Sequence, residues 1–199
     1  MPILLQAQSL AKEYGGETIF SGLSFAVSER QKIGVVGRNG AGKSTLFRII
    51  TGEEKADSGE IIRHEELSLG YLKQEEDWQP GEKALDYLLR LSGKPEWRAR
   101  QLASRFELGP EKLADLANNL SGGWRMRLRL VGMLLQEPNL FLLDEPSNYL
   151  DLSTLILLED YLNAYHGSFL IISHDREFLK RTCQETIEIS KSGCYHYPG

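Results

Sequence analysis

Cysteine is scarce in this sequence of 199 residues, which contains only Cys183 and Cys194. Two cysteines cannot define a disulfide framework or, alone, a zinc site, so we interpret them as reduced thiols of a cytoplasmic protein. No apolar run approaches the ~18 residues that indicate a membrane span. The N-terminal segment 1–6 lacks the basic leader and the long apolar core of a signal peptide. We therefore expect no direct membrane insertion.

An excess of positive charge is also missing, because the formal net charge is −5. This balance removes any general electrostatic argument for binding nucleic acid or a membrane surface, so an RNA contact has to be local or made through a partner. Arg125, Arg127 and Arg129 do not form a basic stripe, since helical residues two apart point away from each other. We interpret this segment as a partly solvated helix with Arg127 packed inward. The hydrophobic content of 41% is that of a chain with a real core.

The order of apolar patterns predicts an α/β fold in a single domain, residues 1–199. We expect a mostly parallel core sheet, an antiparallel β portion near the N-terminus, and a helical subdomain inserted at about 76–136. Within that subdomain Trp97, Leu102 and Phe106 recur at helical spacing. The predicted strands are 4–10, 24–27, 32–36, 60–62, 68–72, 140–143, 169–172, 185–189 and 195–197, and the predicted helices outside the subdomain are 43–50, 151–162 and 175–182. A further helix is expected from the N-cap Ser121 to about residue 136.

A glycine-rich segment, Gly-Arg-Asn-Gly-Ala-Gly-Lys-Ser-Thr, lies between an apolar run at 33–36 and the start of a helix at 46–50. The glycines let backbone N–H groups approach phosphate oxygens, and the helix directs the positive end of its dipole at the same anion. The alternative is a plain glycine-rich turn with a surface lysine, but the strand–loop–helix context favours a nucleoside triphosphate site. The expected nucleotide-binding residues are Gly37, Arg38, Asn39, Gly40, Ala41, Gly42, Lys43, Ser44 and Thr45.

Two carboxylates, Asp144 and Glu145, follow the apolar run 140–143, at the strand end where parallel sheets bind ligands. Asp144 is the expected Mg²⁺ partner together with the Ser44 hydroxyl, and Glu145 is the expected base for an attacking water. The alternative is a pair of solvated acids. A second anion nest is expected at Ser121–Gly123, where a serine and two glycines begin a helix. In isolation this segment would be an ordinary helix cap.

In order and spacing these motifs resemble the ATP-binding cassette ATPases over nearly the whole chain. The segment 37–45 resembles the family's Walker A motif, 120–123 its signature and 140–145 its Walker B motif. The resemblance implies ATP and Mg²⁺ as cofactors, and a second cassette as the partner that completes the site. It also implies the following roles: Glu145 as the catalytic glutamate, Gln74 as the glutamine that senses Mg²⁺ and water, His174 as the switch histidine, Asp151 as the D-loop aspartate and Tyr14 as the aromatic that stacks on adenine.

Finer details resemble the ABC-F branch, whose members carry two cassettes in one chain and often act on ribosomes. The signature continues with Trp124 where transporters have glutamine, the loop 146–151 contains Asn148, and segment 173–179 matches the ABC-F switch region. The ending at 195–199 resembles the close of a first, N-terminal cassette. Two departures are Tyr149, where histidine is usual, and Gly132, where arginine is usual.

The region from Glu75 to Asn119 is too short to hold the long helical arm found in many ABC-F proteins. The sequence therefore predicts ATP binding and hydrolysis in a head-to-tail pair of cassettes. The second cassette lies in the same full-length chain or in a homodimer. The wider role expected from the resemblance is in translation or ribosome protection, with the ribosome as a partner of the full-length protein. Two alternatives stay open: the ATPase subunit of a membrane transporter, and a nucleotide-sensing module with negligible turnover.

Overall fold

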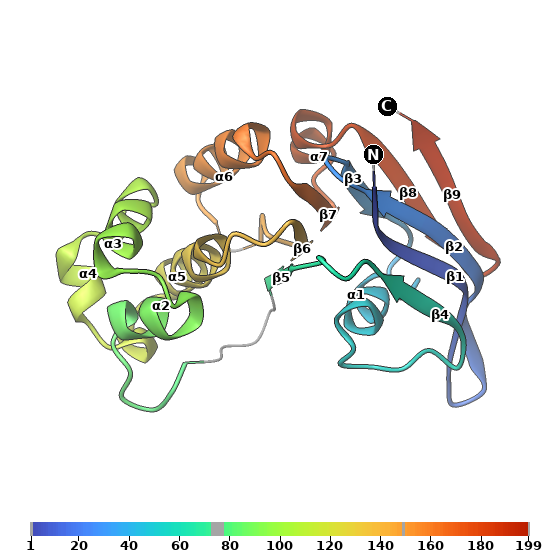
Figure 1. The fold of residues 1–199 in the computed structure, drawn as a ribbon, viewed down its shortest axis with the longest axis horizontal. Coiled ribbons are helices and arrows are strands. Elements are labelled where there is room, and N and C mark those ends of the chain that lie inside the picture. The colour runs from blue at the N-terminus through green and yellow to red at the C-terminus, as the bar shows by residue number, and fades with distance from the viewer. Residues whose placement is uncertain (1, 73–77, 149, 199) are drawn as a thin grey trace. The chain divides into compact units, whose positions relative to one another are not determined.

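The computed structural model describes residues 2–72, 78–148 and 150–198, so Gln74 and Tyr149 lie outside the described residues. The chain forms two compact units (Figure 1). The first unit comprises 1–71, 139–145 and 165–199, and the second comprises 72–138 and 146–164.

A six-stranded sheet of order β5-β6-β7-β3-β8-β9 forms the centre of the first unit. Strands β6, β7, β3 and β8 are parallel, and β9 closes the edge antiparallel to β8. Every residue of β6 and β7 is buried, as expected for a parallel strand covered on both faces. The strands are β3 (Lys32–Val36), β5 (Leu69–Leu72), β6 (Leu140–Asp144), β7 (Ser168–Ile172), β8 (Glu185–Ser190) and β9 (Gly193–Pro198).

The N-terminal strands make a separate antiparallel sheet of order β2-β1-β4, with β1 (Ile3–Tyr14), β2 (Glu17–Ser28) and β4 (Ser58–Arg63). Strands β1 and β2 are longer than predicted because a tight turn at Gly15 and Gly16 extends their pairing to its tip. Both glycines have positive φ, 57° and 83°, which is the conformation that two-residue hairpin turns require. The α/β class, with a mostly parallel sheet and an antiparallel portion, is confirmed.

Helix α1 (Lys43–Thr51) follows β3 directly and buries Leu46, Phe47, Ile49 and Ile50 in the core shared by both sheets. Helix α7 (Arg176–Thr182) also belongs to the first unit. Asp175 caps it by accepting hydrogen bonds from the backbone N–H groups of Glu177 and Phe178.

The described part of the second unit is helical: α2 (Ala84–Ser92), α3 (Glu96–Arg105), α4 (Pro110–Ala114), a short 3₁₀ helix η1 (Ala117–Asn119), α5 (Gly122–Leu135) and α6 (Leu152–Ala164). Trp97, one of the apolar residues at helical spacing, is 64% exposed. The small residues Ala99 and Ala103 form the buried face of α3 instead.

Gly132 explains how closely α2 and α5 pack. A Cβ atom built at Gly132 would lie 3.1 Å from both Leu91 Cδ1 and Tyr87 Cε1 of α2. In the sequence Gly132 is notable only as a departure from the usual arginine, whereas the structure shows a close helix–helix contact that a larger residue would obstruct. Within the described residues, no helix is both long enough and apolar enough to cross a membrane.

Candidate functional site

The phosphate loop occupies the turn between the end of β3 at Val36 and the start of α1 at Lys43. A Cβ atom at Gly37 would lie 2.6 Å from the Ile189 carbonyl oxygen, and one at Gly42 would lie 2.5 Å from Ile19 Cγ2. Both residues also have positive φ, 153° and 87°. These two positions therefore require glycine, because a side chain would displace the loop from β8 and β2.

Lys43 is buried and its ammonium group lies over the loop. Its Nζ atom donates to the carbonyl oxygens of Gly37, at 2.9 Å, and of Arg38, at 3.2 Å. The next residues, Ser44 and Thr45, begin α1, so their N–H groups belong to the first turn, whose donors have no partner within the helix. The loop thus presents one cation and several backbone donors at a single helix terminus, which is the chemistry that binds phosphate.

Asp144 ends the buried strand β6 and is only 4% exposed. Burial raises the pKa of its carboxyl above the ordinary aspartate value, while a hydrogen bond from Ser44 and the charge of Lys43 oppose that shift. One buried oxygen, Oδ1, has no hydrogen-bond partner. An orphaned carboxylate oxygen beside a serine hydroxyl fits Mg²⁺, which prefers oxygen ligands. The described residues contain no cluster of three acidic, histidine or cysteine side chains, so such an ion would need phosphate and water oxygens as well.

Glu145 follows Asp144 in a left-handed conformation, with φ 50°, which few residues other than glycine adopt. Its backbone N–H donates to the Ile172 carbonyl at 2.9 Å, which ties the turn to β7. Burial raises the pKa of its carboxyl, and the neighbouring His174 opposes this shift.

His174 follows β7 and lies beside Glu145. Its Nε2 atom is 3.3 Å from Glu145 Oε1, and its backbone N–H donates to Oε2 at 3.4 Å. The contact at Oε1 lacks hydrogen-bond geometry, so this buried oxygen keeps a free acceptor position. The structure thus brings two of the expected catalytic residues together at the carboxyl ends of neighbouring parallel strands.

Tyr14 is placed at the tip of the β1–β2 hairpin and is 44% exposed. Its hydroxyl donates to Glu54, and the Lys12 ammonium lies 5.2 Å from its ring centroid. Sequence reasoning missed Glu54, because nothing in the local pattern pairs it with a residue 40 positions away. Adenine stacking by Tyr14 stays a prediction, and the predicted roles of Gln74 fall outside the described residues.

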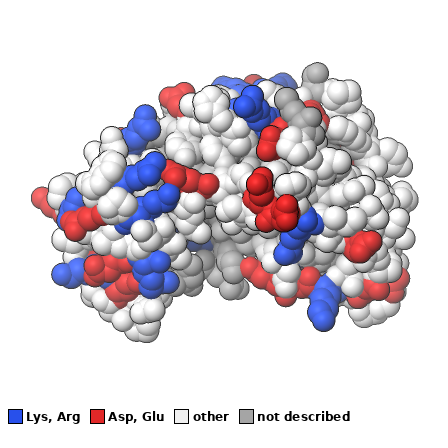
Figure 2. All heavy atoms as spheres, viewed as in Figure 1, with Lys and Arg blue, Asp and Glu red and all other residues white. Residues whose placement is uncertain are grey.

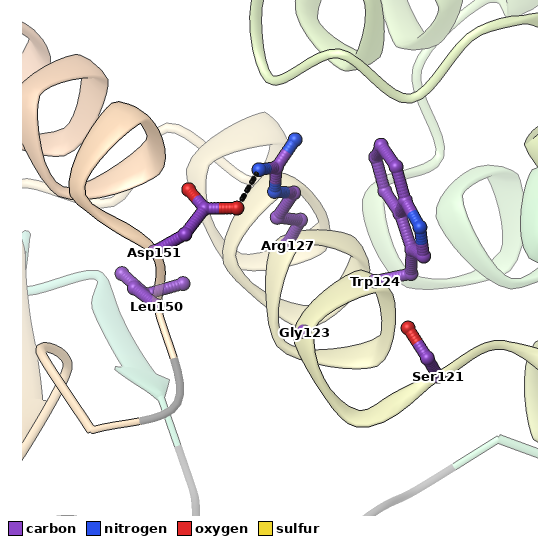
Figure 3. A pocket seen from close by; sticks show the side chains of 6 residues that line it. All are labelled: Ser121, Gly123, Trp124, Arg127, Leu150 and Asp151. Carbon is purple, nitrogen blue, oxygen red and sulfur yellow. Dashed lines mark hydrogen bonds and ion pairs between the residues drawn. The ribbon is translucent and has the colours of Figure 1, made fainter.

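The signature and D-loop residues line a separate pocket of about 150 Å³ within the second unit (Figure 3). Its lining residues are Ser121, Gly123, Trp124, Arg127, Leu150 and Asp151. Ser121 occupies the N-cap position of α5, but its side chain makes no capping hydrogen bond. Arg127 is 5% exposed, which confirms that it packs inward near the signature. Sequence reasoning did not foresee its ionic partners, Glu107 and Asp151.

A glycine-rich loop between a parallel strand and a helix, with the buried Asp144 and the partly buried Glu145 at the end of another strand of the sheet, defines the class of P-loop nucleotide-binding proteins. The sequence matches the family model described as ABC transporter over residues 20–148, which is more than half of the chain. The chain belongs to this ABC transporter family of ATP-binding cassettes.

Three curated relatives show where in that family the similarity lies. The putative ATP-binding protein YdiF of Bacillus subtilis is 34% identical over 99% of this chain. The energy-dependent translational throttle protein EttA of Escherichia coli (strain K12) is 36% identical over 96% of this chain, and ABC transporter F family member 5 of Arabidopsis thaliana is 33% identical over 92%. The chain spans only 33% to 38% of the length of these relatives.

Solved structures share the fold at lower identity. An ATP-binding subunit of an ABC transporter superposes with a TM-score of 0.87 at 21% identity, covering 98% of this chain and 90% of its own. A nucleotide-free ATP-binding cassette from an ABC transporter gives 0.77 at 20% identity, covering 100% of this chain and 92% of its own. At such identities the likeness concerns the fold alone.

Proposed function

We propose that this chain is an ATP-hydrolysing cassette of the ABC-F type, half of a head-to-tail pair that encloses ATP. The observation that carries the proposal is the grouping in one unit of Lys43, the buried Asp144, and Glu145 with a free acceptor position beside His174. This grouping supports one phosphate site with a base for water, to which the opposite cassette would add its signature segment.

The mechanism follows from these contacts. Lys43 and the N–H groups of the loop bind the β- and γ-phosphates and spread their charge. Ser44 and Asp144 would hold Mg²⁺, which would neutralise further charge on the same phosphates. Glu145, with its raised pKa, accepts a hydrogen bond from the attacking water and aligns it with the γ-phosphorus. His174, mostly exposed next to it, contacts the γ-phosphate.

The ABC-F assignment rests on the relatives at 33% to 36% identity and on the features that depart from transporter cassettes, such as Trp124 and Asn148. EttA is named for an action on translation. We extend this to the full-length protein, with the ribosome as partner, a cytoplasmic location and this chain as the N-terminal cassette. The alignment with YdiF spans 241 positions, more than the 199 residues here, so YdiF carries insertions that this chain lacks.

Charge distribution argues that this cassette alone does not hold RNA. Among the described residues on the face in Figure 2, Lys and Arg side chains alternate with Asp and Glu rather than forming a continuous basic surface. Binding to RNA phosphates depends on clustered cations, so we expect no strong sedimentation of this chain with ribosomes at physiological salt. The second candidate is the ATPase subunit of a transporter, because the matching family model is described as ABC transporter.

Glu145→Gln tests the proposal. The amide keeps the shape of the site but loses the base, so ATP stays bound and stabilises the pair by mass action. Light scattering should show a dimer with Mg-ATP and a monomer with Mg-ADP. The matched control, Lys43→Ala in the Glu145→Gln chain, should stay monomeric with ATP. A Glu145→Gln chain that is monomeric with saturating ATP would contradict the pairing, and trapping of the full-length protein on membranes rather than ribosomes would favour the transporter.

A further inference from the structure

Arg127 connects three segments of the second unit. Its Nη1 atom lies 2.5 Å from Glu107 Oε2, just beyond the end of α3, and its Nη2 atom lies 2.5 Å from Asp151 Oδ2, just before α6. The guanidinium carbon lies 4.4 Å from the ring centroid of Trp124 on its own helix, α5. Arg127 is buried while both carboxylate partners are mostly exposed, so the buried cation organises the two acids around it.

The two carboxylate oxygens of Asp151 accept hydrogen bonds from different partners. Oδ1 accepts hydrogen bonds from the Thr154 N–H and the Ser153 hydroxyl, both at 2.8 Å, and so caps the start of α6. Oδ2 accepts from Arg127, as the dashed line in Figure 3 shows. The hydrogen bonds from Thr154 and Ser153, helped by Arg127, hold the pKa of this carboxyl well below its usual range, so it remains a charged partner at neutral pH.

We propose that Arg127 is a positioning residue that locks the D-loop aspartate, Asp151, to the signature helix α5. The lock makes the signature end of α5 and the start of α6 one preformed surface. This inference rests on the proposed function, because a paired cassette would use both segments to meet the opposite nucleotide.

The geometry favours this role over a purely structural ion pair. Asp151 Oδ1 caps α6 through Thr154 and Ser153 without using Arg127, so the ion pair at Oδ2 is not needed for that cap. Both Arg127 and Asp151 line the pocket that also contains Ser121 and Gly123. A planar guanidinium can meet two carboxylates from fixed directions, whereas a lysine ammonium is a point charge on a flexible stem. Arg127→Lys should therefore keep the charge and lose the fixed geometry.

Hydrogen exchange of this chain, followed in the peptide covering 150–155, tests the lock directly. Arg127→Lys and Asp151→Asn should each speed exchange roughly tenfold, and the double variant should exchange no faster than either single variant. Glu107→Gln removes only the other partner, and Arg100→Lys alters an exposed ion pair with Glu96 in the same unit. Both controls should exchange at the wild-type rate. The proposal would be overturned if the peptide covering 150–155 exchanged at the wild-type rate in Arg127→Lys. It would also be overturned if Glu107→Gln sped exchange as much as Arg127→Lys does.

A second readout separates this lock from the proposed function. In the Glu145→Gln chain with Mg-ATP, adding Arg127→Lys should raise the dimer dissociation constant roughly tenfold, with the ATP affinity of the dilute monomer unchanged. An unchanged dimer constant would overturn the positioning role even if exchange rises. If Glu145→Gln itself forms no dimer, the pairing proposal fails, and the exchange measurement still decides whether Arg127 locks Asp151.

Discussion

At the scale of single residues, hydrogen bonds within the protein hold the side chains of the proposed nucleotide site. The Lys43 ammonium group donates hydrogen bonds to two carbonyl oxygens of its own loop. The backbone N–H of Glu145 donates to a carbonyl oxygen of β7. Such preorganisation lowers the cost of arranging charge around a phosphate.

Lys43→Ala should weaken Mg-ATP binding roughly 10- to 100-fold, because a hydrogen bond to a charged group contributes about 1.5–3 kcal/mol. Titration calorimetry measures this directly. Lys191→Ala, at an exposed position in the turn between β8 and β9, should bind ATP like the wild type. Unchanged affinity in Lys43→Ala would contradict the phosphate-binding role.

Asp144→Asn should stabilise the ligand-free protein at neutral pH while removing the carboxylate. The folded-state pKa of Asp144 is raised by burial, so folding favours the protonated form, and stability falls as pH rises through that pKa. The asparagine amide carries no charge, so the cost of burying a charged carboxylate is removed. Each 1 kcal/mol gained in the free energy of unfolding should raise the melting temperature by about 2–4 °C.

Thermal denaturation followed by circular dichroism at several pH values measures the effect. The difference in melting temperature between Asp144→Asn and the wild type should disappear at acid pH, where both side chains are uncharged. Glu65→Gln, which replaces an exposed acid in the same unit, should have the same melting temperature as the wild type. A lower melting temperature for Asp144→Asn at pH 8 would show that the hydrogen bond from Ser44 outweighs burial.

At the scale of elements, the contact between α2 and α5 depends on a missing side chain. Gly132→Ala would gain up to ~1 kcal/mol of helix propensity. Its Cβ atom would, however, enter a space 3.1 Å from Tyr87 and Leu91, and such overpacking typically costs about 1–3 kcal/mol.

We therefore expect Gly132→Ala to lower the free energy of unfolding by about 1 kcal/mol in urea denaturation. Gly109→Ala is the matched control, because a Cβ atom there meets nothing within 4 Å. Gly109 is the N-cap of α4, so any loss there comes from alanine being a poorer N-cap than glycine and not from overpacking. A stabilised Gly132→Ala would mean that α2 moves aside at little cost.

At the scale of the whole molecule, the nucleotide loop and the signature pocket belong to different units of the chain. If a second copy supplies the signature to each ATP, the ATPase rate per chain should rise with protein concentration and level off once dimers dominate. A coupled phosphate-release assay over a wide concentration range measures this, with Glu145→Gln as the inactive control. A rate per chain that is constant down to high dilution would show that one cassette hydrolyses ATP alone.

The sequence alone determined the phosphate loop, the carboxylates after β6, and the α/β class. Each depends on neighbouring residues: glycine spacing sets the turn, and an unbroken apolar run such as 140–143 specifies a strand buried on both faces. The predicted ends of β1 and β2 were less accurate. Pairing across the turn, rather than the residue pattern of either strand, decides where these two strands end.

Only the tertiary structure decided the contacts between segments far apart in the chain. It paired Arg127 with Glu107 and Asp151, set Tyr87 against Gly132, and left Trp97 exposed. Periodicity shows which side of a helix is apolar, but it does not show which neighbour will cover that side. Burial and ion pairing depend on how elements pack in three dimensions, so no local pattern contains them.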